Sequence, residues 1–274
     1  MSEGVDLHLL LEFAGETAQR AGELLLEGLS ERGASERLAA AATKSSPTDL
    51  VTELDRACEA LIVKALRTRR PEDGLLGEEG TSRAGSSGLT WVIDPLDGTT
   101  NFVYGYGSFA VSIALVDAGG PLLGVVHDPL RGETFSAARG LGAHLDGRRL
   151  AAPAASGPLS EALLGTGFGY DTELRVAQAR LLPTVLGAVR DLRRGGSAAL
   201  DLCSVASGRL DGYFEAGLAP WDRAAGELVV TEAGGVVLEV SGPHAGRTTL
   251  VASPPDRLEA LLALLASAAE GATR

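Results

Sequence analysis

Hydrophobic residues in the first part of the chain recur with helical spacing. Over residues 5–29 an apolar stripe repeats every three or four positions, which predicts a helix with one side facing the core. Residues 30–46 are polar and rich in alanine, and we expect a surface loop there. Apolar residues regain helical spacing over residues 49–68, which predicts a second helix.

The middle of the chain has the pattern of strands. Short apolar runs with turn residues between them predict strands near residues 74–77, 91–93, 109–116, 121–128 and 133–138, followed by a hairpin over 140–148. Such a meander indicates an antiparallel sheet. An alanine-, proline- and serine-rich stretch at 151–158 predicts a boundary, so we expect two halves, residues 1–152 and 153–274.

Strands and helices alternate after that boundary. We expect strands at 163–166, 189–192, 212–215, 236–240 and 249–252, and helices at 174–186, 198–207, 222–233 and 257–269. This alternation predicts a sheet covered by helices on both faces. The fold class we expect is α/β (α+β), a layered αβαβα sandwich with an antiparallel or mixed sheet in the first half.

Residues 91–102, WVIDPLDGTTNF, carry the most specific chemical pattern. An apolar strand end is followed by Asp94 and Asp97, and we expect Pro95 between them to end the strand. Gly98 and Thr99 then predict the start of a helix, where main-chain N–H groups favour a phosphate. Carboxylates beside a phosphate are the surroundings that Mg²⁺ prefers. A simple Asp-Gly turn would need neither the other acid nor the threonines, so the pattern favours a metal–phosphate site.

Composition limits the classes of protein that the chain can belong to. It has 274 residues, 45% of them apolar and 22% charged, as expected for a globular protein with a sizeable core. The net charge of −12 argues against a nucleic-acid-binding protein. Bound cations would reconcile this charge with a phosphate substrate. Cys58 and Cys203 are expected to be reduced, buried thiols, and no metal-ligand spacing relates the histidines at 8, 127, 144 and 244.

The sequence shows no feature of a membrane or exported protein. No apolar run approaches the length of about 18 residues that a membrane-spanning helix needs. The first ten residues contain acids rather than the basic segment of a signal peptide. We therefore expect no membrane partner and a cytoplasmic location.

Four motifs resemble those of the inositol monophosphatase family, Mg²⁺-dependent phosphomonoesterases. The string DPLDGTTNF at 94–102 is similar to the main motif of that family, and WDRAAG at 221–226 with TEAGG at 231–235 is similar to its second. TDLVTELD at 48–55 and GEE at 77–79 resemble its two upstream acidic motifs. The motifs follow the family order and extend from about residue 44 to residue 235.

The resemblance implies a set of site residues. The metal ligands would be the acids of these motifs and one main-chain carbonyl, namely Glu78, Asp94, Leu96, Asp97 and Asp222. Thr99 and Asp55 would orient the attacking water, which Glu78 would support through its metal. The substrate would contact Leu96, Asp97, Gly98, Thr99, Gly196, Ser197, Ala198, Glu215 and Asp222. The resemblance also implies two or three Mg²⁺ ions, inhibition by Li⁺ and a homodimer.

Local patterns leave alternatives at several of these positions. Asp222 also suits a helix N-cap, and Asp55 suits a solvated acid favoured by the helix dipole. Arg194 is either a pocket residue or a surface charge, and Tyr170 lies near the expected pocket. The glycines at 165–169 lack the spacing of a dinucleotide-binding loop and indicate a turn.

The substrate and the class of function also have alternatives. In terms of the family resemblance, Thr100, Asn101, Phe102 and Glu215 favour inositol 1-phosphate as the small phosphate ester. Relatives with these motifs act instead on fructose 1,6-bisphosphate, histidinol phosphate, 3′-phosphoadenosine phosphates or NADP(H). A different class would be a catalytically silent regulator that binds a phosphate ligand. Clustered acids argue against that class, because like charges repel one another without a metal.

Overall fold

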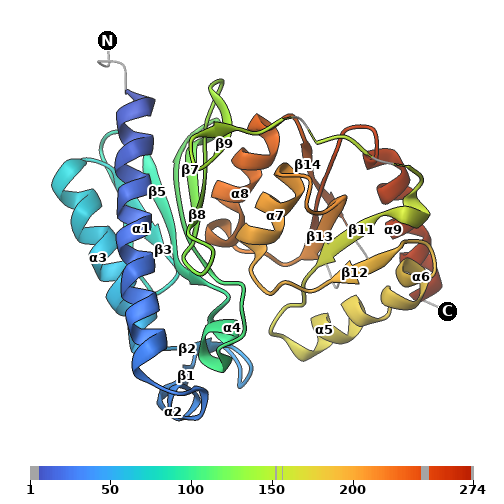
Figure 1. The fold of residues 1–274 in the computed structure, drawn as a ribbon, viewed down its shortest axis with the longest axis horizontal. Coiled ribbons are helices and arrows are strands. Elements are labelled where there is room, and N and C mark those ends of the chain that lie inside the picture. Colours follow the sequence, from blue (N-terminus) through green and yellow to red (C-terminus); the bar gives the residue numbers. More distant parts are fainter. Residues whose placement is uncertain (1–5, 152, 156, 242–246, 273–274) are drawn as a thin grey trace.

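A computed structural model of the chain describes residues 6–151, 153–155, 157–241 and 247–272 (Figure 1). The larger of its sheets contains β3 (Gly74–Gly77), β4 (Ser82–Arg83), β5 (Thr90–Asp97), β6 (Ala110–Asp117), β7 (Gly120–Asp128), β8 (Glu133–Ala138), β9 (Gly142–Leu145) and β10 (Arg148–Arg149). The strand order is β10-β9-β8-β7-β6-β5-β3-β4, and the only parallel pair among these described strands is β3 with β5. The predicted antiparallel meander is therefore confirmed.

The smaller sheet is mixed. It contains β11 (Leu163–Thr166), β12 (Asp191–Arg193), β13 (Gly212–Ala216), β14 (Val236–Ser241) and β15 (Thr248–Ser253), in the order β12-β11-β13-β15-β14. β11 runs parallel to both of its neighbours, whereas β15 is antiparallel to both of its own. A separate short pair joins β1 (Ala42–Thr43) and β2 (Leu50–Val51).

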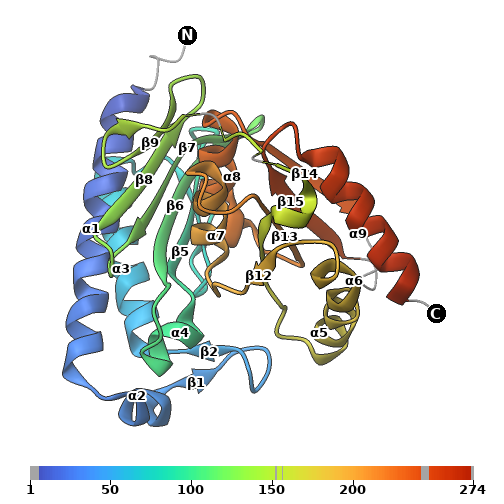
Figure 2. The ribbon, with the colours of Figure 1, turned by 45° about the vertical axis from the view of Figure 1, so that its right-hand side comes forward.

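The helices form three layers around these sheets (Figures 1 and 2). α1 (Leu7–Glu31) and α3 (Glu53–Arg69) cover the outer face of the larger sheet, and α7 (Ala198–Ala206) and α8 (Pro220–Glu232) lie between the sheets. α6 (Leu182–Leu186) and α9 (Leu258–Ala272) cover the far face of the smaller sheet, with the single turn η1 (Leu159–Glu161) and α5 (Thr172–Ala179) preceding α6. α2 (Ala34–Ala40) and α4 (Thr99–Tyr104) lie together at one end of β5 (Figure 2). The predicted αβαβα sandwich is confirmed.

β5 is buried on both faces, which explains its continuous apolar run. Trp91 and Ile93 pack toward α1 and α3, whereas Val92 belongs to the core that α7 and α8 form with the sheets. The indole Nε1 of Trp91 donates to Asp73 Oδ2 at 2.9 Å, so its one polar atom is satisfied. On β7, a Cβ at Gly124 would lie 2.7 Å from the Cα of Ala225 on α8, so glycine lets α8 approach the sheet closely.

Two predictions about the first helices were wrong. The segment 30–46 is not all loop, because its alanine-rich part forms α2, and Arg37 of that helix is buried. The guanidinium of Arg37 donates to the carbonyl oxygens of Leu29 and Val103, at the ends of α1 and α4, which ties α2 to both helices. The helix predicted from residue 49 begins at Glu53, because residues 50–51 form β2 and Thr52 is the N-cap.

Three further predictions need correction. Pro95 does not end its strand, because β5 continues to Asp97 through a register shift between Asp94 and Asp97. The helix predicted at 174–186 is two helices, and Pro183 stands in the first turn of α6, where its missing N–H costs nothing. Asp222 is not the N-cap of α8, which is Ala219, but lies three residues inside.

Other predictions are confirmed or stay open. Cys58 and Cys203 are both free and buried. Within the described residues, no helix has the length and apolar character of a membrane span. The start of the first predicted helix at residue 5, His244 and the boundary at residue 152 lie outside the described residues. The division into halves at that boundary stays a prediction, as does the cytoplasmic location.

Candidate active site

The acids of the first half meet where β3 and β5 end. These strands are parallel, and Gly77 lies opposite Ile93. The residue after Gly77 is Glu78 and the residue after Ile93 is Asp94, so these two acids lie side by side. The N–H of Glu78 donates to the carbonyl oxygen of Ile93 at 3.1 Å, which fixes this neighbourhood. Asp97 completes the group at the last position of β5.

Asp222 joins this group from the other side of the chain. It lies in the first turn of α8, and its charge acts on Asp94 together with those of Glu78 and Asp97. Burial and then these three neighbours raise the pKa of Asp94 well above its ordinary value. Burial and then Asp97 do the same to the pKa of Asp222. The structure therefore brings together the four carboxylates that the sequence predicted as metal ligands.

Hydrogen bonds hold Asp94, Asp97 and Asp222 in place. Asp97 Oδ2 accepts from Ser197 Oγ at 2.5 Å and from the N–H of Ala199 at 2.8 Å. Burial raises the pKa of Asp97 to about 6, although these two bonds oppose the shift. Asp94 Oδ1 accepts from the N–H of Leu96 at 3.0 Å, and Asp222 Oδ2 accepts from the N–H of Ala219 at 2.6 Å.

The fit of this group to a divalent cation rests on its charge and donor type. Within the described part of the chain, no three potential metal-ligating side chains already form a cage. The donors are nevertheless hard carboxylate oxygens, which Mg²⁺ prefers. Burial and then the neighbouring acids raise the pKa of Asp94 and of Asp222, and a bound cation would oppose both effects. Lys44 supplies a positive charge here, with its Nζ 2.8 Å from Glu78 Oε1 and in contact with Glu79.

Thr99 and Asp55 form a buried pair beside the acids. The hydroxyl of Thr99 lies 3.0 Å from Asp55 Oδ1 and 3.1 Å from the carbonyl oxygen of Leu96. The other oxygen of Asp55 accepts from the N–H and hydroxyl of Thr52, at 2.8 and 2.5 Å. Burial raises the pKa of Asp55, and the bonds from Thr52 and Thr99 oppose that rise. This arrangement contradicts the alternative of a solvated acid at Asp55, which is 1% exposed.

Gly98 links these residues to the second half of the chain. Its φ of 97° lies in the left-handed region that favours glycine. A Cβ there would lie 2.9 Å from the carbonyl oxygen of Ser108 and 3.1 Å from that of Gly196. Asn101 crosses the same junction, because its Nδ2 donates to the carbonyl oxygens of Ser108 and Gly195 at 2.7 and 2.8 Å.

A cavity of about 240 Å³ opens beside these acids. Its walls include five of the predicted substrate-contacting residues: Asp97, Gly196, Ala198, Glu215 and Asp222. Ser197 lies behind the wall with its hydroxyl on Asp97, and Leu96, Gly98 and Thr99 are not among the described lining residues. Glu215 accepts from the hydroxyl of Tyr213 at 2.5 Å. Burial raises the pKa of Glu215 to about 7, against the opposing effects of Tyr213 and Arg194.

Sequence reasoning missed part of this site. Arg247 lines the cavity and was not predicted there, whereas Phe168, Tyr170 and Arg194, which also line it, were candidates that the sequence left open. Lys44 belongs to the segment 30–46 that was predicted as a loop, and the resemblance implies that this loop approaches the metal site, but a contact between Lys44 and Glu78 was not predicted. The one available signal was that Lys44 is one of only two lysines in a chain whose other basic residues are arginines. For Arg247 the sequence contains no comparable signal.

Comparison with known proteins decides the family. The model of the inositol monophosphatase family matches residues 6–272. The chain belongs to this family. Every residue of the candidate site lies within the matched range, so the inositol monophosphatase match covers all the positions that the sequence predicted as metal, catalytic or substrate residues.

Individual members of the inositol monophosphatase family are similar over most of their length. A Mycobacterium tuberculosis protein named inositol-1-monophosphatase SuhB is 50% identical over 232 residues, which cover 81% of this chain and 80% of the relative. The Escherichia coli protein named Nus factor SuhB is 41% identical over 261 residues, with 94% and 96% coverage. The solved structure of inositol monophosphatase from Anabaena superposes with a TM-score of 0.80 at 34% identity and covers 96% of this chain and 97% of its own.

Proposed function

We propose that this chain is a Mg²⁺-dependent phosphatase that hydrolyses a small sugar or polyol phosphate monoester, with inositol 1-phosphate as its main substrate. The observation that carries the proposal is the convergence of four carboxylates from both halves of the chain. Glu78, Asp94 and Asp97 come from the ends of β3 and β5, and Asp222 comes from α8. The names of the mycobacterial relatives support the same reaction.

These four carboxylates and the carbonyl oxygen of Leu96 would hold two or three Mg²⁺ ions. When bound, such ions lower the pKa of a coordinated water and offset negative charge on the leaving oxygen. Inhibition by Li⁺ at one of the metal positions is part of the proposal.

The surrounding residues would position the water and the phosphate. Thr99, whose hydroxyl lies 3.0 Å from Asp55, would orient the attacking water in line with the phosphorus atom. The backbone N–H groups of Gly98 and Thr99 would hold phosphate oxygens, and Glu78 would support the water from the metal side. Asp55 is itself fixed by Thr52, so the orientation of the Thr99 hydroxyl is preorganised.

The cavity favours a small polyol as the leaving group. Its volume of about 240 Å³ lies below the range of about 300–1,000 Å³ that is common for drug-sized ligands. Glu215 presents a carboxylate to that space, which suits hydrogen bonds from ring hydroxyls. Fructose 1,6-bisphosphate, histidinol phosphate and the nucleotides 3′-phosphoadenosine phosphate and NADP(H) are the alternative substrates. Comparing kcat/KM across these esters tests the choice.

The reaction class is tested by phosphate release from myo-inositol 1-phosphate. Wild-type protein should require Mg²⁺ and lose activity in EDTA, and Asp97→Asn should lose at least about 100-fold in kcat/KM. Asp117→Asn is the matched control, because Asp117 belongs to an exposed ion pair with Arg139 away from the site. Full activity in EDTA, or in Asp97→Asn, would contradict the metal-dependent reaction.

A second candidate function is that of a Nus factor, which the name of the Escherichia coli relative favours. The form of this candidate that we consider is a catalytically silent protein that binds a phosphate ligand. The substrate panel separates the two candidates. Binding of Mg²⁺ and inositol 1-phosphate without phosphate release from any ester would favour the second candidate.

We also propose a homodimer, on the basis of the family resemblance. Sedimentation equilibrium should give a mass near twice the 28.1 kDa of the chain. A mass of one chain at micromolar concentration would contradict this proposal and leave the reaction class intact.

A further inference from the structure

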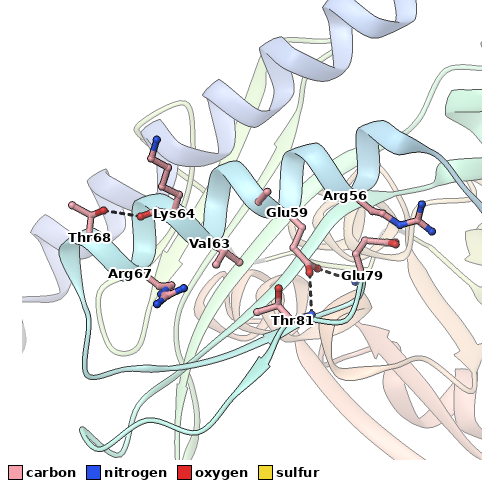
Figure 3. A pocket seen from close by; sticks show the side chains of 9 residues that line it. Arg56, Glu59, Val63, Lys64, Arg67, Thr68, Glu79 and Thr81 are labelled. Carbon is pink, nitrogen blue, oxygen red and sulfur yellow. Dashed lines mark hydrogen bonds between the residues drawn. The ribbon is translucent and has the colours of Figure 1, made fainter.

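α3 carries a second buried acid one helical turn beyond Asp55. This residue is Glu59, which is 4% exposed. Figure 3 shows its side chain reaching from α3 to the backbone that follows β3. Glu59 Oε2 accepts from the N–H of Glu79 at 2.8 Å, and Oε1 accepts from the N–H of Thr81 at 3.1 Å. Both carboxylate oxygens are thus bonded to the acidic turn that contains Glu78.

These two bonds complete the anchoring of that turn. Its ends are joined by the N–H of Gly77, which donates to the carbonyl oxygen of Thr81 at 2.7 Å. The N–H of Glu78 donates to the carbonyl oxygen of Ile93 on β5 at 3.1 Å, and the next N–H, that of Glu79, goes to Glu59. The backbone of Glu78 is therefore fixed on one side by β5 and on the other by α3.

The residue before Glu78 leaves room for this contact. A Cβ at Gly77 would lie only 2.3 Å from Glu59 Oε2 and 2.6 Å from its carboxyl carbon. The φ of Gly77 lies outside the left-handed region, so the backbone conformation does not require glycine there. The requirement for glycine comes from the close approach of the Glu59 carboxylate to the chain.

Asp55 and Glu59 are four residues apart and therefore lie on the same side of α3. Asp55 bonds to Thr99, and Glu59 bonds to the turn that presents Glu78. One rigid helix thus sets the position of the water-orienting pair and of a metal ligand relative to each other. Displacing the turn from α3 would move Glu78 away from Asp94, whereas Asp55 and Thr99 would stay in place.

We propose that Glu59 is a positioning residue for the metal-binding carboxylate of Glu78. This inference rests on the proposed function in one respect, namely that Glu78 is a metal ligand. Groups that orient metal ligands commonly change metal affinity by about 10–100-fold when they are removed. A carboxylate suits this position because it offers an acceptor to each of two N–H groups, whereas an amide offers only one.

The test is metal binding rather than turnover. Free Mn²⁺ is measured by electron paramagnetic resonance during titration of the wild type, Glu59→Gln and Glu59→Ala. Glu59→Ala should bind Mn²⁺ about 10–100-fold more weakly than the wild type, and Glu59→Gln should show a smaller loss because its amide keeps one acceptor. Glu53→Gln is the matched control, because it removes an exposed carboxylate from the same helix, and its affinity should stay within about twofold.

A double-mutant cycle tests the contact with Gly77. Gly77→Ala should weaken Mn²⁺ binding, because its new methyl group displaces the Glu59 carboxylate. Combining it with Glu59→Ala removes the clash, so the double variant should bind no more weakly than Glu59→Ala alone. Fully additive losses would refute the close contact as the cause.

The outcomes separate this inference from the proposed function. If Glu59→Ala lowers the melting temperature but binds Mn²⁺ as the wild type does, Glu59 is only structural and the inference is wrong. If the wild type binds no Mn²⁺, the inference and the proposed function both fail. If the wild type binds Mn²⁺, the Glu59 variants bind it more weakly and no ester is hydrolysed, the inference stands and only the proposed function fails.

Discussion

The loss of stability caused by an ionised acid in the candidate site can be measured at Glu215. Its carboxylate is half-buried near the end of β13, accepts from the hydroxyl of Tyr213 and faces the cavity. The substitution Glu215→Gln keeps the shape and an acceptor for Tyr213 but removes the charge. If burying that charge is costly, the variant should be more stable than the wild type wherever the wild-type side chain is ionised.

The magnitude follows from the pKa of Glu215. Burial raises this pKa from 4.5 to about 7, and each pKa unit corresponds to about 1.4 kcal/mol. The folded protein therefore holds the proton more tightly than the unfolded chain does. The resulting stability, about 3 kcal/mol in all, is fully present below pH 4.5 and is lost as the pH rises through about 7. Between pH 5 and pH 8 the wild type should lose roughly 2–3 kcal/mol relative to Glu215→Gln.

Urea unfolding in EDTA at pH 5 and pH 8 measures this difference. The gap in unfolding free energy between Glu215→Gln and the wild type should be larger at pH 8, and Glu259→Gln, an exposed acid on α9, is the control. A gap of equal size at both pH values would refute the reasoning, because it would show that Glu215 has no raised pKa. The same variant should raise KM for inositol 1-phosphate, since Glu215 lines the cavity.

Three more predictions follow from contacts in and near the site. Thr99→Ala should lower single-turnover phosphate release by about 100-fold or more while Mn²⁺ binding is retained, and unchanged turnover would remove Thr99 from the mechanism. Ser197→Ala removes a donor to Asp97 and the N-cap of α7, so its unfolding free energy in urea should fall by about 1–2 kcal/mol and its Mg²⁺ half-saturation should rise. Gly124→Ala should cost about 1–3 kcal/mol in thermal unfolding because its Cβ meets the backbone of α8, whereas Gly15→Ala on α1, which meets nothing within 4 Å, should be neutral or stabilising. Equal effects of the two alanines would contradict the packing argument.

Local patterns predicted much of this molecule because the relevant residues act through their near neighbours in sequence. The apolar run at Trp91 and Ile93 identified β5, and Gly98 identified the start of α4. The resemblance to the inositol monophosphatase family then named Asp55, Glu78 and the other acids, which the structure brings together.

The failures come from contacts that are distant in sequence. Arg37 stabilises α2 by bonding to Leu29 and Val103, and the spacing within residues 30–46 contains no trace of the second partner. Pro95 stays in β5 because a bulge accommodates it, and the hydrogen-bond register that allows the bulge is set by β6. The hydrogen bonds from the N–H groups of Glu79 and Thr81 to Glu59 also could not be predicted, because nothing near Glu59 in sequence distinguishes it from an exposed helical acid.

The helices α7 and α8 have both of their faces covered, one by each sheet. A fragment that ended before α7 would leave the inner side of the larger sheet bare, with Val92, Val126 and Phe135 in contact with water. Such a fragment would expose a contiguous apolar face and should aggregate rather than fold. The helices that cover this apolar face therefore also supply Asp222, so the core of the larger sheet and the fourth carboxylate of the candidate site depend on the same part of the chain.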